Sequence, residues 1–300
     1  METFQQDTND FYHAQPGLNF SRVKLALKSA RNFKLERVEP SKAMDFGTVL
    51  HTKILTPKLF DDCYTAKPAN RTKEQKVVFN EWKIEICKRM GIDPIIGDKD
   101  DKTIKPQTQV EFLHEMRKYG FTVIDKADLN LIYALCEAVE RNAFASALID
   151  ASEKEVSVYC PVNLHEDFPV IKCRPDGVNF EQGYFFDLKS AKDASVGGFN
   201  EAIKSQHYDL QAEWYCRTLN MALEYEGEEP IDWKFYWIAA EKTGMHCVVH
   251  ERTEMYKETG EAKFNKAMET IREALATDEY RGYLNGTIEP SIWYHKKWSE

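Results

Sequence analysis

Apolar residues recur at helical spacing in several segments of the first half of the chain. In residues 21–33, Val23, Leu27 and Ala30 share one helix face, and Ser21 is suited to cap the helix N-terminus. A long helix is predicted to begin with Asp125 as its N-cap. The pattern therefore predicts helices over residues 21–33, 42–55, 77–90 and 125–149.

The second half of the chain has a different pattern of residue types. Short runs rich in β-branched and aromatic residues are separated by turn-forming segments at residues 163–167 and 179–183, which is typical of an antiparallel meander. The pattern predicts three strands over residues 155–160, 168–173 and 183–189, followed by a helix over residues 199–223. Two strands over residues 233–241 and 245–251 and a helix over residues 263–275 follow.

This order of elements predicts an α/β fold with a central mixed sheet flanked by helices. No internal repeat or change of composition marks a linker, so we expect a single domain over residues 1–300. Within it, residues 1–150 would form a mainly helical N-terminal elaboration, residues 151–250 the sheet and its main helix, and residues 251–300 a C-terminal helix and tail.

The composition narrows the class of protein. No apolar run approaches the roughly 20 residues that a membrane helix needs, and the first residues show no basic and apolar export signal. The seven cysteines are odd in number and never in CxxC spacing, which favours reduced thiols over disulfides, zinc or an iron–sulfur cluster. We therefore expect a cytoplasmic protein with no membrane partner.

The formal net charge of −9 argues against a surface coated for nonspecific DNA binding. Local basic runs at residues 28–37 and 71–76 could still form a positive surface on an acidic body, although either run alone is more simply a solvated helix face. Carboxylates gathered around a metal ion would also contribute to the negative charge.

Candidate chemistry lies in residues 174–195, RPDGVNFEQGYFFDLKSAKDAS. Asp176 follows Pro175 where the second predicted strand ends, and Asp187 lies near the end of the third. Their spacing suits adjacent strands joined by a hairpin, which would bring two mutually repelling carboxylates together and favour a bound cation such as Mg²⁺ or Mn²⁺. Lys189 projects from the same strand face as Asp187. This set suits metal-dependent phosphodiester hydrolysis, and the simpler alternative is a charged surface hairpin.

Three motifs of the chain resemble those of a known nuclease superfamily. RPD and FFDLK resemble the PD-(D/E)xK signature, with Asp176, Asp187 and Lys189 at its three positions. YDLQAEWY is similar to the QxxxY motif of the RecB-like branch, and FGTVLH is similar to the GxxxH helix of that branch, which begins here at Gly47. Within the branch, residues 17–33 (GLNFSRVKLALKSARNF) resemble the N-terminal element of RecE-type exodeoxyribonuclease VIII nuclease domains, with Asn19 and Val23 as departures outside the metal site.

The resemblance covers roughly residues 12–223 and implies a restriction-endonuclease-like PD-(D/E)xK core. It implies that His51, Asp176, Asp187 and the backbone carbonyl of Leu188 bind Mg²⁺, for which Mn²⁺ could substitute. Lys189 would position water. Gln211 and Tyr215 would orient the DNA strand and the scissile phosphate, and Glu155 would be an outer-sphere ligand. Separately, Ser21, Arg22 and Lys24 lie at a predicted helix N-terminus, where backbone amides and the helix dipole favour an anion, so they could hold the 5′-phosphate of the DNA end. The alternative for these three residues is an ordinary N-cap with solvated basic side chains.

The implied activity is 5′→3′ digestion of linear double-stranded DNA. The resulting 3′ overhang would pass to a RecT-like single-strand annealing protein, and the nuclease would form a homo-oligomeric ring. Two alternatives stay open. One is another RecB-like nuclease, either a structure-specific endonuclease or a CRISPR-adaptation type, although the latter's cluster-binding cysteines have no counterpart here. The other is an inactive DNA-binding module.

Overall fold

The structure is a computed structural model that describes residues 2–36, 42–69, 71–89, 121–283 and 289. Its helices are α1 (Asn9–Ala14), α2 (Phe20–Ala26), α3 (Ala30–Leu35), α4 (Lys42–Leu55), α5 (Pro57–Cys63), α6 (Lys73–Arg89), α8 (Lys126–Arg141), α9 (Ala143–Asp150), α10 (Val196–Gln206), α11 (Tyr208–Glu226) and α12 (Glu254–Thr277). Its strands are β1 (Phe4–Gln5), β2 (Tyr64–Ala66), β3 (Thr122–Ile124), β4 (Glu153–Lys154), β5 (Ser157–His165), β6 (Phe168–Cys173), β7 (Gly177–Asn179), β8 (Tyr184–Ala191), β9 (Lys234–Glu241) and β10 (Cys247–Glu251).

The central sheet has the order β10-β9-β8-β7-β4. Strands β8 and β9 are parallel, and the other neighbours are antiparallel, so the sheet is mixed as predicted. Parallel neighbours need a long crossover connection, which α10 and α11 provide between β8 and β9. No helix among the described residues is long and apolar enough to cross a membrane.

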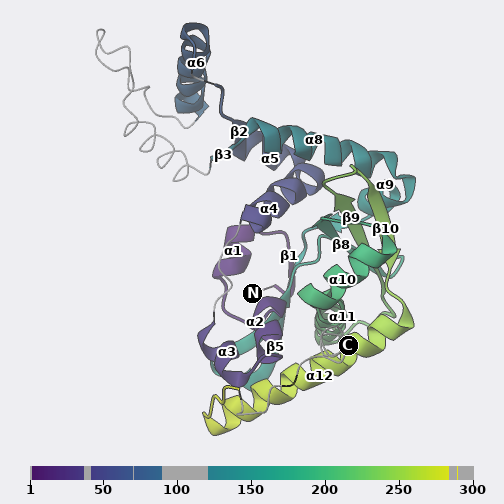
Figure 1. Ribbon diagram of the computed structural model, residues 1–300. Helices are drawn as coiled ribbons and strands as arrows, with labels where there is room; N and C mark the ends of the chain where they lie inside the picture. Colours follow the sequence, from purple (N-terminus) through teal and green to yellow (C-terminus); the bar gives the residue numbers. More distant parts are fainter. Residues whose placement is uncertain (1, 37–41, 70, 90–120, 284–288, 290–300) are drawn as a thin grey trace.

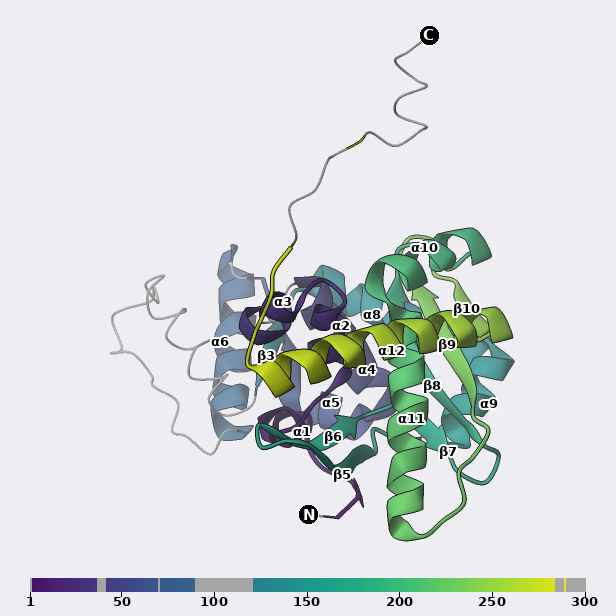
Figure 2. The ribbon, with the colours of Figure 1, turned by 90° about the horizontal axis from the view of Figure 1, so that it is seen from below.

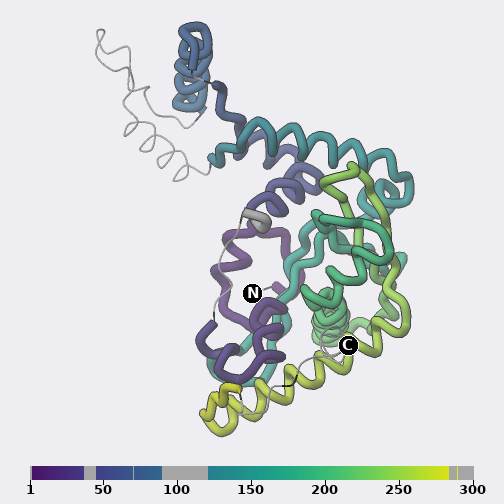
Figure 3. The backbone as a smooth tube through the Cα atoms, viewed as in Figure 1, coloured from purple at the N-terminus to yellow at the C-terminus, as the bar shows by residue number. Residues whose placement is uncertain are grey.

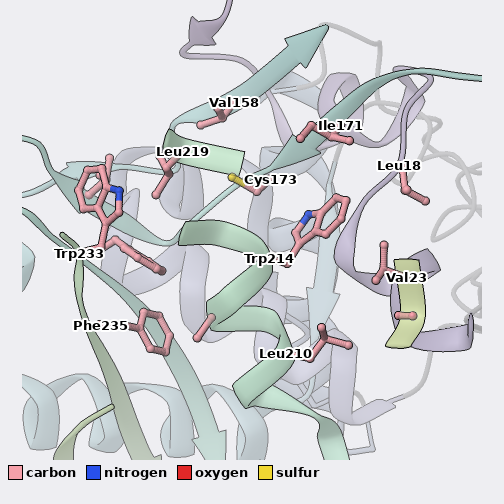
Figure 4. Packing of buried hydrophobic residues seen from close by; sticks show 14 of the residues in the cluster. Leu18, Val23, Val158, Ile171, Cys173, Leu210, Trp214, Leu219, Trp233 and Phe235 are labelled. Atoms are coloured by element: carbon pink, nitrogen blue, oxygen red, sulfur yellow. The ribbon is translucent and has the colours of Figure 1, made fainter. Parts of the chain in front are cut away.

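Both faces of the central sheet are covered (Figure 1). Because side chains alternate along a strand, Phe185 of β8 joins one core cluster with Trp214 of α11, while Phe186 and Leu188 join a second cluster with Leu50 of α4. Figure 4 shows Trp214 in the first cluster. Helix α12 runs across α11 on the outside of that layer (Figure 2). Two-sided burial explains why β8 begins with three consecutive aromatic residues, Tyr184, Phe185 and Phe186.

A second sheet, ordered β1-β5-β6, packs against α11. The β5–β6 pair is the predicted antiparallel hairpin. The first strand, β1, adds to the outer edge of β5, and Leu18 makes a parallel bridge to Ile171 on the outer edge of β6. The N-terminal segment therefore lies along both edges of this hairpin.

A small lobe projects from the main body (Figures 1 and 3). Strands β2 and β3 pair in parallel at its base, and α6 forms its described helix. Its own apolar cluster consists of Phe79, Trp82, Ile86, Cys87 and Phe121. The predicted helix over residues 77–90 corresponds to α6, and Met90 lies outside the described residues.

Three predicted helices are each divided in two by local capping. Residues 21–33 form α2 and α3, and the N-cap of α2 is Asn19, not Ser21, because the Asn19 side chain accepts the Arg22 amide proton at 3.1 Å. Residues 125–149 form α8 and α9, with Asn142 capping α9. Asp125 occupies the N-cap position of α8 but makes no capping hydrogen bond through its side chain. Between α10 and α11, His207 has a left-handed backbone with φ +58°.

The predicted three-stranded meander was wrong beyond its first hairpin. Strands β6 and β8 belong to different sheets, and a short strand that the sequence pattern missed, β7, lies between them. The hairpin partner of β8 is β7, with Gly177 opposite Phe186. Gly177 is required there because a Cβ atom would lie 2.2 Å from a carbon of the Phe186 ring. The chain can thus leave one sheet after Cys173 and enter the other directly after Asp176.

Candidate active site

The two signature carboxylates lie on neighbouring strands of the central sheet. Asp176 immediately precedes β7, and Asp187 is in β8, one position beyond the Gly177–Phe186 pair. The Leu188 amide donates to Asp176 Oδ2 at 2.6 Å, which ties the two strands together. Both residues are buried, with 9% exposure for Asp176 and 3% for Asp187. The predicted convergence of the two carboxylates is therefore found, with Asp187 on the third predicted strand, β8. Its neighbour beside Asp176 is β7 in place of the second predicted strand.

His51 reaches this position from α4, which packs on the face of β8 opposite to α11. Its Nδ1 atom lies 3.3 Å from Asp176 Oδ1. Gly47, one helical turn earlier, lies near β8, but a Cβ atom there would be 3.9 Å from Ser190 Oγ, an ordinary contact. The histidine of the GxxxH motif thus meets the first carboxylate, while its glycine is not required by close packing.

Lys189 and Asp187 form an ion pair within β8. The Lys189 ammonium also lies 4.6 Å from the ring centroid of Tyr208, the first residue of α11, which is a favourable cation–π distance. The lysine is thereby held between a carboxylate and an aromatic face. Its ammonium remains beside the two acidic residues, as their spacing predicted.

Gln211 and Tyr215 come from α11, one helical turn apart. The Gln211 amide nitrogen donates to Asp187 Oδ1 at 2.9 Å and to the Tyr215 hydroxyl at 3.0 Å. The amide oxygen of Gln211 is buried and has no hydrogen-bond partner among the described residues. The QxxxY pair therefore orients Asp187 directly and leaves one buried acceptor available.

The environment moves the pKa of each ionisable group in this site. Burial raises the pKa of Asp187 to about 6, and the charge of Asp176 adds to this effect, while Lys189 opposes it. Burial also acts to raise the pKa of Asp176, but His51, Lys189 and the Leu188 amide outweigh it and leave the pKa below its usual value. For His51, burial is outweighed by the two carboxylates, which raise its pKa.

The donor set of His51, Asp176 and Asp187 suits a hard divalent cation, which binds carboxylate oxygens and can accept an imidazole. Burial raises the pKa of Asp187, and the charge of Asp176 raises it further, so a bound cation would lower the cost of ionising this carboxylate. Within the described part of the chain, no three His, Cys, Asp or Glu side chains are already arranged around a common metal position. Asp187 is turned toward Lys189 and Gln211, whereas His51 and Asp176 face each other.

Glu155 and Leu188 are the remaining residues that were predicted to act at the metal. Glu155 lies beside Asp176, because its amide donates to the Asp176 carbonyl at 3.1 Å, but its carboxylate is paired with Arg174. Leu188 contributes its amide to Asp176, as described above, and its side chain is buried in the core. The roles of the Glu155 carboxylate and the Leu188 carbonyl as ligands stay predictions.

The predicted DNA-end residues lie on α2 in different surroundings. Burial and the nearby charge of Lys189 lower the pKa of Lys24, which places this lysine close to the site. Arg22 instead stacks over the Phe33 ring, with its guanidinium carbon 5.0 Å from the centroid, and Ser21 is exposed. The structure thus brings Lys24 toward the acidic site, and the joint role of the three residues at a DNA end stays a prediction.

Sequence reasoning missed two residues beside the site, Arg174 and Asp7. Arg174 stands two residues before Asp176 in the signature itself, and its side chain is largely buried. That adjacency was an available signal. Asp7 forms an ion pair with Arg174 at 3.0 Å across 167 residues of sequence, and no local pattern could have indicated that contact.

A mixed sheet with two adjacent buried carboxylates and a lysine two residues after the second defines a PD-(D/E)xK-like domain. The chain belongs to the family described as "PDDEXK-like domain of unknown function (DUF3799)", whose model matches residues 19–289. Nucleases of this kind typically depend on a divalent metal ion.

Two solved structures are similar to this chain. One is a protein from Eubacterium rectale, named provisionally as an exonuclease, with 14% identity and a TM-score of 0.55 over 98% of this chain and 99% of that one. This likeness shows a shared fold. The other is a phage-related exonuclease from Haemophilus somnus 129PT, with 11% identity and a TM-score of 0.29 over 90% of this chain and 100% of that one. No curated protein matches the chain.

Proposed function

We propose that this protein is a Mg²⁺-dependent exodeoxyribonuclease that digests linear double-stranded DNA in the 5′→3′ direction. The observation that supports it best is the placement of Asp187, which contacts Lys189 and Gln211 and neighbours Asp176 within one buried site. An ion pair made only for stability would not need a second carboxylate beside it, because like charges raise the cost of ionisation. The name of the similar Eubacterium rectale protein favours an exonuclease over an endonuclease.

In this proposal His51, Asp176, Asp187 and the Leu188 carbonyl hold Mg²⁺, and Mn²⁺ can substitute. The bound ion supplies Lewis-acid stabilisation of the phosphate and lowers the pKa of a water molecule. Lys189 orients the attacking water and offsets negative charge on the phosphate in the transition state. Gln211 holds the Asp187 carboxylate in position, and Tyr215 holds the amide of Gln211.

The biological role is proposed on the RecE-type resemblance. Digestion would leave 3′ single-stranded overhangs for a RecT-like annealing protein, and the nuclease would work as a homo-oligomeric ring around DNA. A solution mass equal to one chain at working concentration would count against the ring. The Glu155 carboxylate, as an outer-sphere ligand, and Ser21, Arg22 and Lys24, at the DNA end, complete the proposed set.

The test is digestion of linear duplex DNA labelled at either the 5′ or the 3′ end, with Mg²⁺ or with EDTA. Native protein is compared with Asp187→Ala and with Asp232→Ala, a matched control whose side chain is 93% exposed on the loop before β9. We expect early release of 5′-labelled mononucleotide by native protein and Asp232→Ala, and none by Asp187→Ala or with EDTA. Early release of the 3′ label would indicate digestion in the 3′→5′ direction, and cutting of closed circular DNA would indicate an endonuclease. DNA binding without any cleavage would support the alternative of an inactive DNA-binding module.

A further inference from the structure

The N-terminal segment, residues 2–18, precedes the part of the chain that the family model matches. It is nevertheless fixed to the β5–β6 hairpin at several points. Strand β1 pairs with β5, and Leu18 exchanges backbone hydrogen bonds with Val170 and Lys172 of β6. The buried Lys172 ammonium donates to the carbonyls of Tyr12 and Gln15, both at 2.6 Å. This segment is therefore an integral part of the fold beside the site.

Asp7 lies in the middle of this segment, and its side chain is only 9% exposed. Its carboxylate accepts hydrogen bonds from Arg174 Nη1 at 3.0 Å, from the Tyr159 hydroxyl at 2.7 Å and from the Ser157 hydroxyl. Burial of a carboxylate is tolerated where a cation and several donors satisfy its oxygens. Asp7 is thus held in one orientation, with Arg174 as its charged partner.

Arg174 links Asp7 to the active site through Glu155. Its other terminal nitrogen, Nη2, pairs with Glu155 Oε2 at 3.0 Å, so one planar guanidinium joins two carboxylates. Glu155 has a left-handed backbone with φ +52°, which is strained for a residue with a Cβ atom and persists only when its surroundings enforce it. In that conformation the Glu155 amide donates to the carbonyl of Asp176 at 3.1 Å.

We propose that Asp7 is a positioning residue of the active site, acting through Arg174 and Glu155 to fix the backbone of Asp176. The N-terminal segment is then a functional part of this nuclease and not only a stabilising strap. The inference rests on the proposed function, because it concerns the placement of a carboxylate used in that reaction. Removing the negative charge of Asp7 leaves Glu155 as the one carboxylate paired with the largely buried Arg174 among the described residues, although Arg174 Nη1 still donates to Ser157 Oγ at 3.3 Å. The guanidinium is then no longer held between two carboxylates, and the strained conformation of Glu155 is less strongly enforced.

The test compares native protein with Asp7→Asn, which keeps the side-chain shape, and with Asp10→Asn. Asp10 is an exposed residue of the same segment, so the control removes the same charge without touching Arg174. The readouts are kcat and KM on linear DNA, the thermal midpoint, and amide hydrogen exchange at Glu155 and Leu188, whose amides both donate to Asp176. Exchange at Trp237 in the central strand β9 serves as the reference for global stability.

For Asp7→Asn we expect kcat to fall about 10- to 100-fold, the range found when a partner of a metal-site residue is removed, with KM changed less than about threefold. Exchange at Glu155 and Leu188 should accelerate at least about tenfold, while Trp237 and the Asp10→Asn control stay at the native values. A lowered thermal midpoint with native kcat, and with native exchange at both amides, would overturn the inference and leave a purely structural role.

The two proposals fail in different ways. If native protein does not cleave DNA, the proposed function fails, and hydrogen exchange at Glu155 and Leu188 still decides whether Asp7 fixes Asp176. If native protein cleaves and Asp7→Asn cleaves equally fast, only the positioning role fails. Should Asp7→Asn not fold, Asp7→Glu keeps the charge and lengthens the side chain by one methylene. Intermediate kcat and exchange would then support the inference, and native values of both would overturn it.

Discussion

Asp187 should make the metal-free protein less stable at neutral pH, and Asp187→Asn should relieve this effect. The side chain is 4% exposed and its pKa is raised to about 6 from 3.8, first by burial and then by the charge of Asp176. The attraction of Lys189 already lowers this pKa, so the remaining shift is the net cost of ionising the group in the folded state. Asparagine has nearly the same shape and carries no charge.

The magnitude follows from the shift in pKa. The difference 6 − 3.8 is 2.2, and at about 1.36 kcal/mol for each pKa unit the ionised carboxylate costs about 3 kcal/mol of folding free energy. Because the folded state holds the proton more tightly, this cost is absent below about pH 4 and grows as the pH rises to about 6. It is fully present above that pH. Asp187→Asn should therefore gain up to about 3 kcal/mol at pH 8 and nothing at pH 4.

The assay is urea unfolding in EDTA at several pH values between 4 and 8. Asp176→Asn is the matched control with the opposite sign, because His51, Lys189 and the Leu188 amide lower the pKa of Asp176, so its ionised form stabilises the fold above its unfolded pKa. We expect Asp176→Asn to lose stability at pH 8. If Asp187→Asn were less stable than native protein at pH 8, the conclusion that ionised Asp187 destabilises the metal-free fold would be refuted.

Three further predictions concern the fold and the DNA contact. Asn142→Ala removes the cap of α9 and a hydrogen bond to the Cys247 carbonyl, and should lower the unfolding free energy by about 1–3 kcal/mol in urea titration. Gly260→Ala should lower the thermal midpoint despite better helix propensity, because its Cβ atom would lie 2.6 Å from the Asp209 carbonyl oxygen, at a cost of about 1–3 kcal/mol. Lys24→Ala should raise KM for DNA several-fold, with kcat little changed in steady-state assays, because it removes a cation near the site and no proposed ligand.

The parts of the site that could be predicted from sequence are those fixed by local geometry. Asp187 and Lys189 share a strand face because they are two residues apart, and Gln211 and Tyr215 meet because they are four apart on a helix. His51 required the motif resemblance, since no spacing rule links it to Asp176 across 125 residues.

The errors also have physical causes. The sequence pattern showed helical periodicity on both sides of His207, but it could not show the single left-handed residue that redirects the chain between α10 and α11. Strand β7 is only three residues long, too short for a periodic signal, and it lies next to a Pro-Asp that reads as a turn. Its assignment required the pairing with β8, which is a property of the folded chain.

The overall charge of the protein and the charge near its site are different quantities. The chain carries a net charge of −9, yet the pKa of Lys24 is lowered by burial and then by its cationic neighbours Lys189 and Lys28. Burial also lowers the pKa of His207, and Lys263 and Lys24 lower it further. Cations that depress one another's pKa values gain from a polyanion that binds beside them, because it relieves their mutual repulsion. Lys28 and Lys263 are each paired with a carboxylate, Glu36 and Asp209. In the proposed function, these lysines and Lys24 would receive the DNA backbone beside the site.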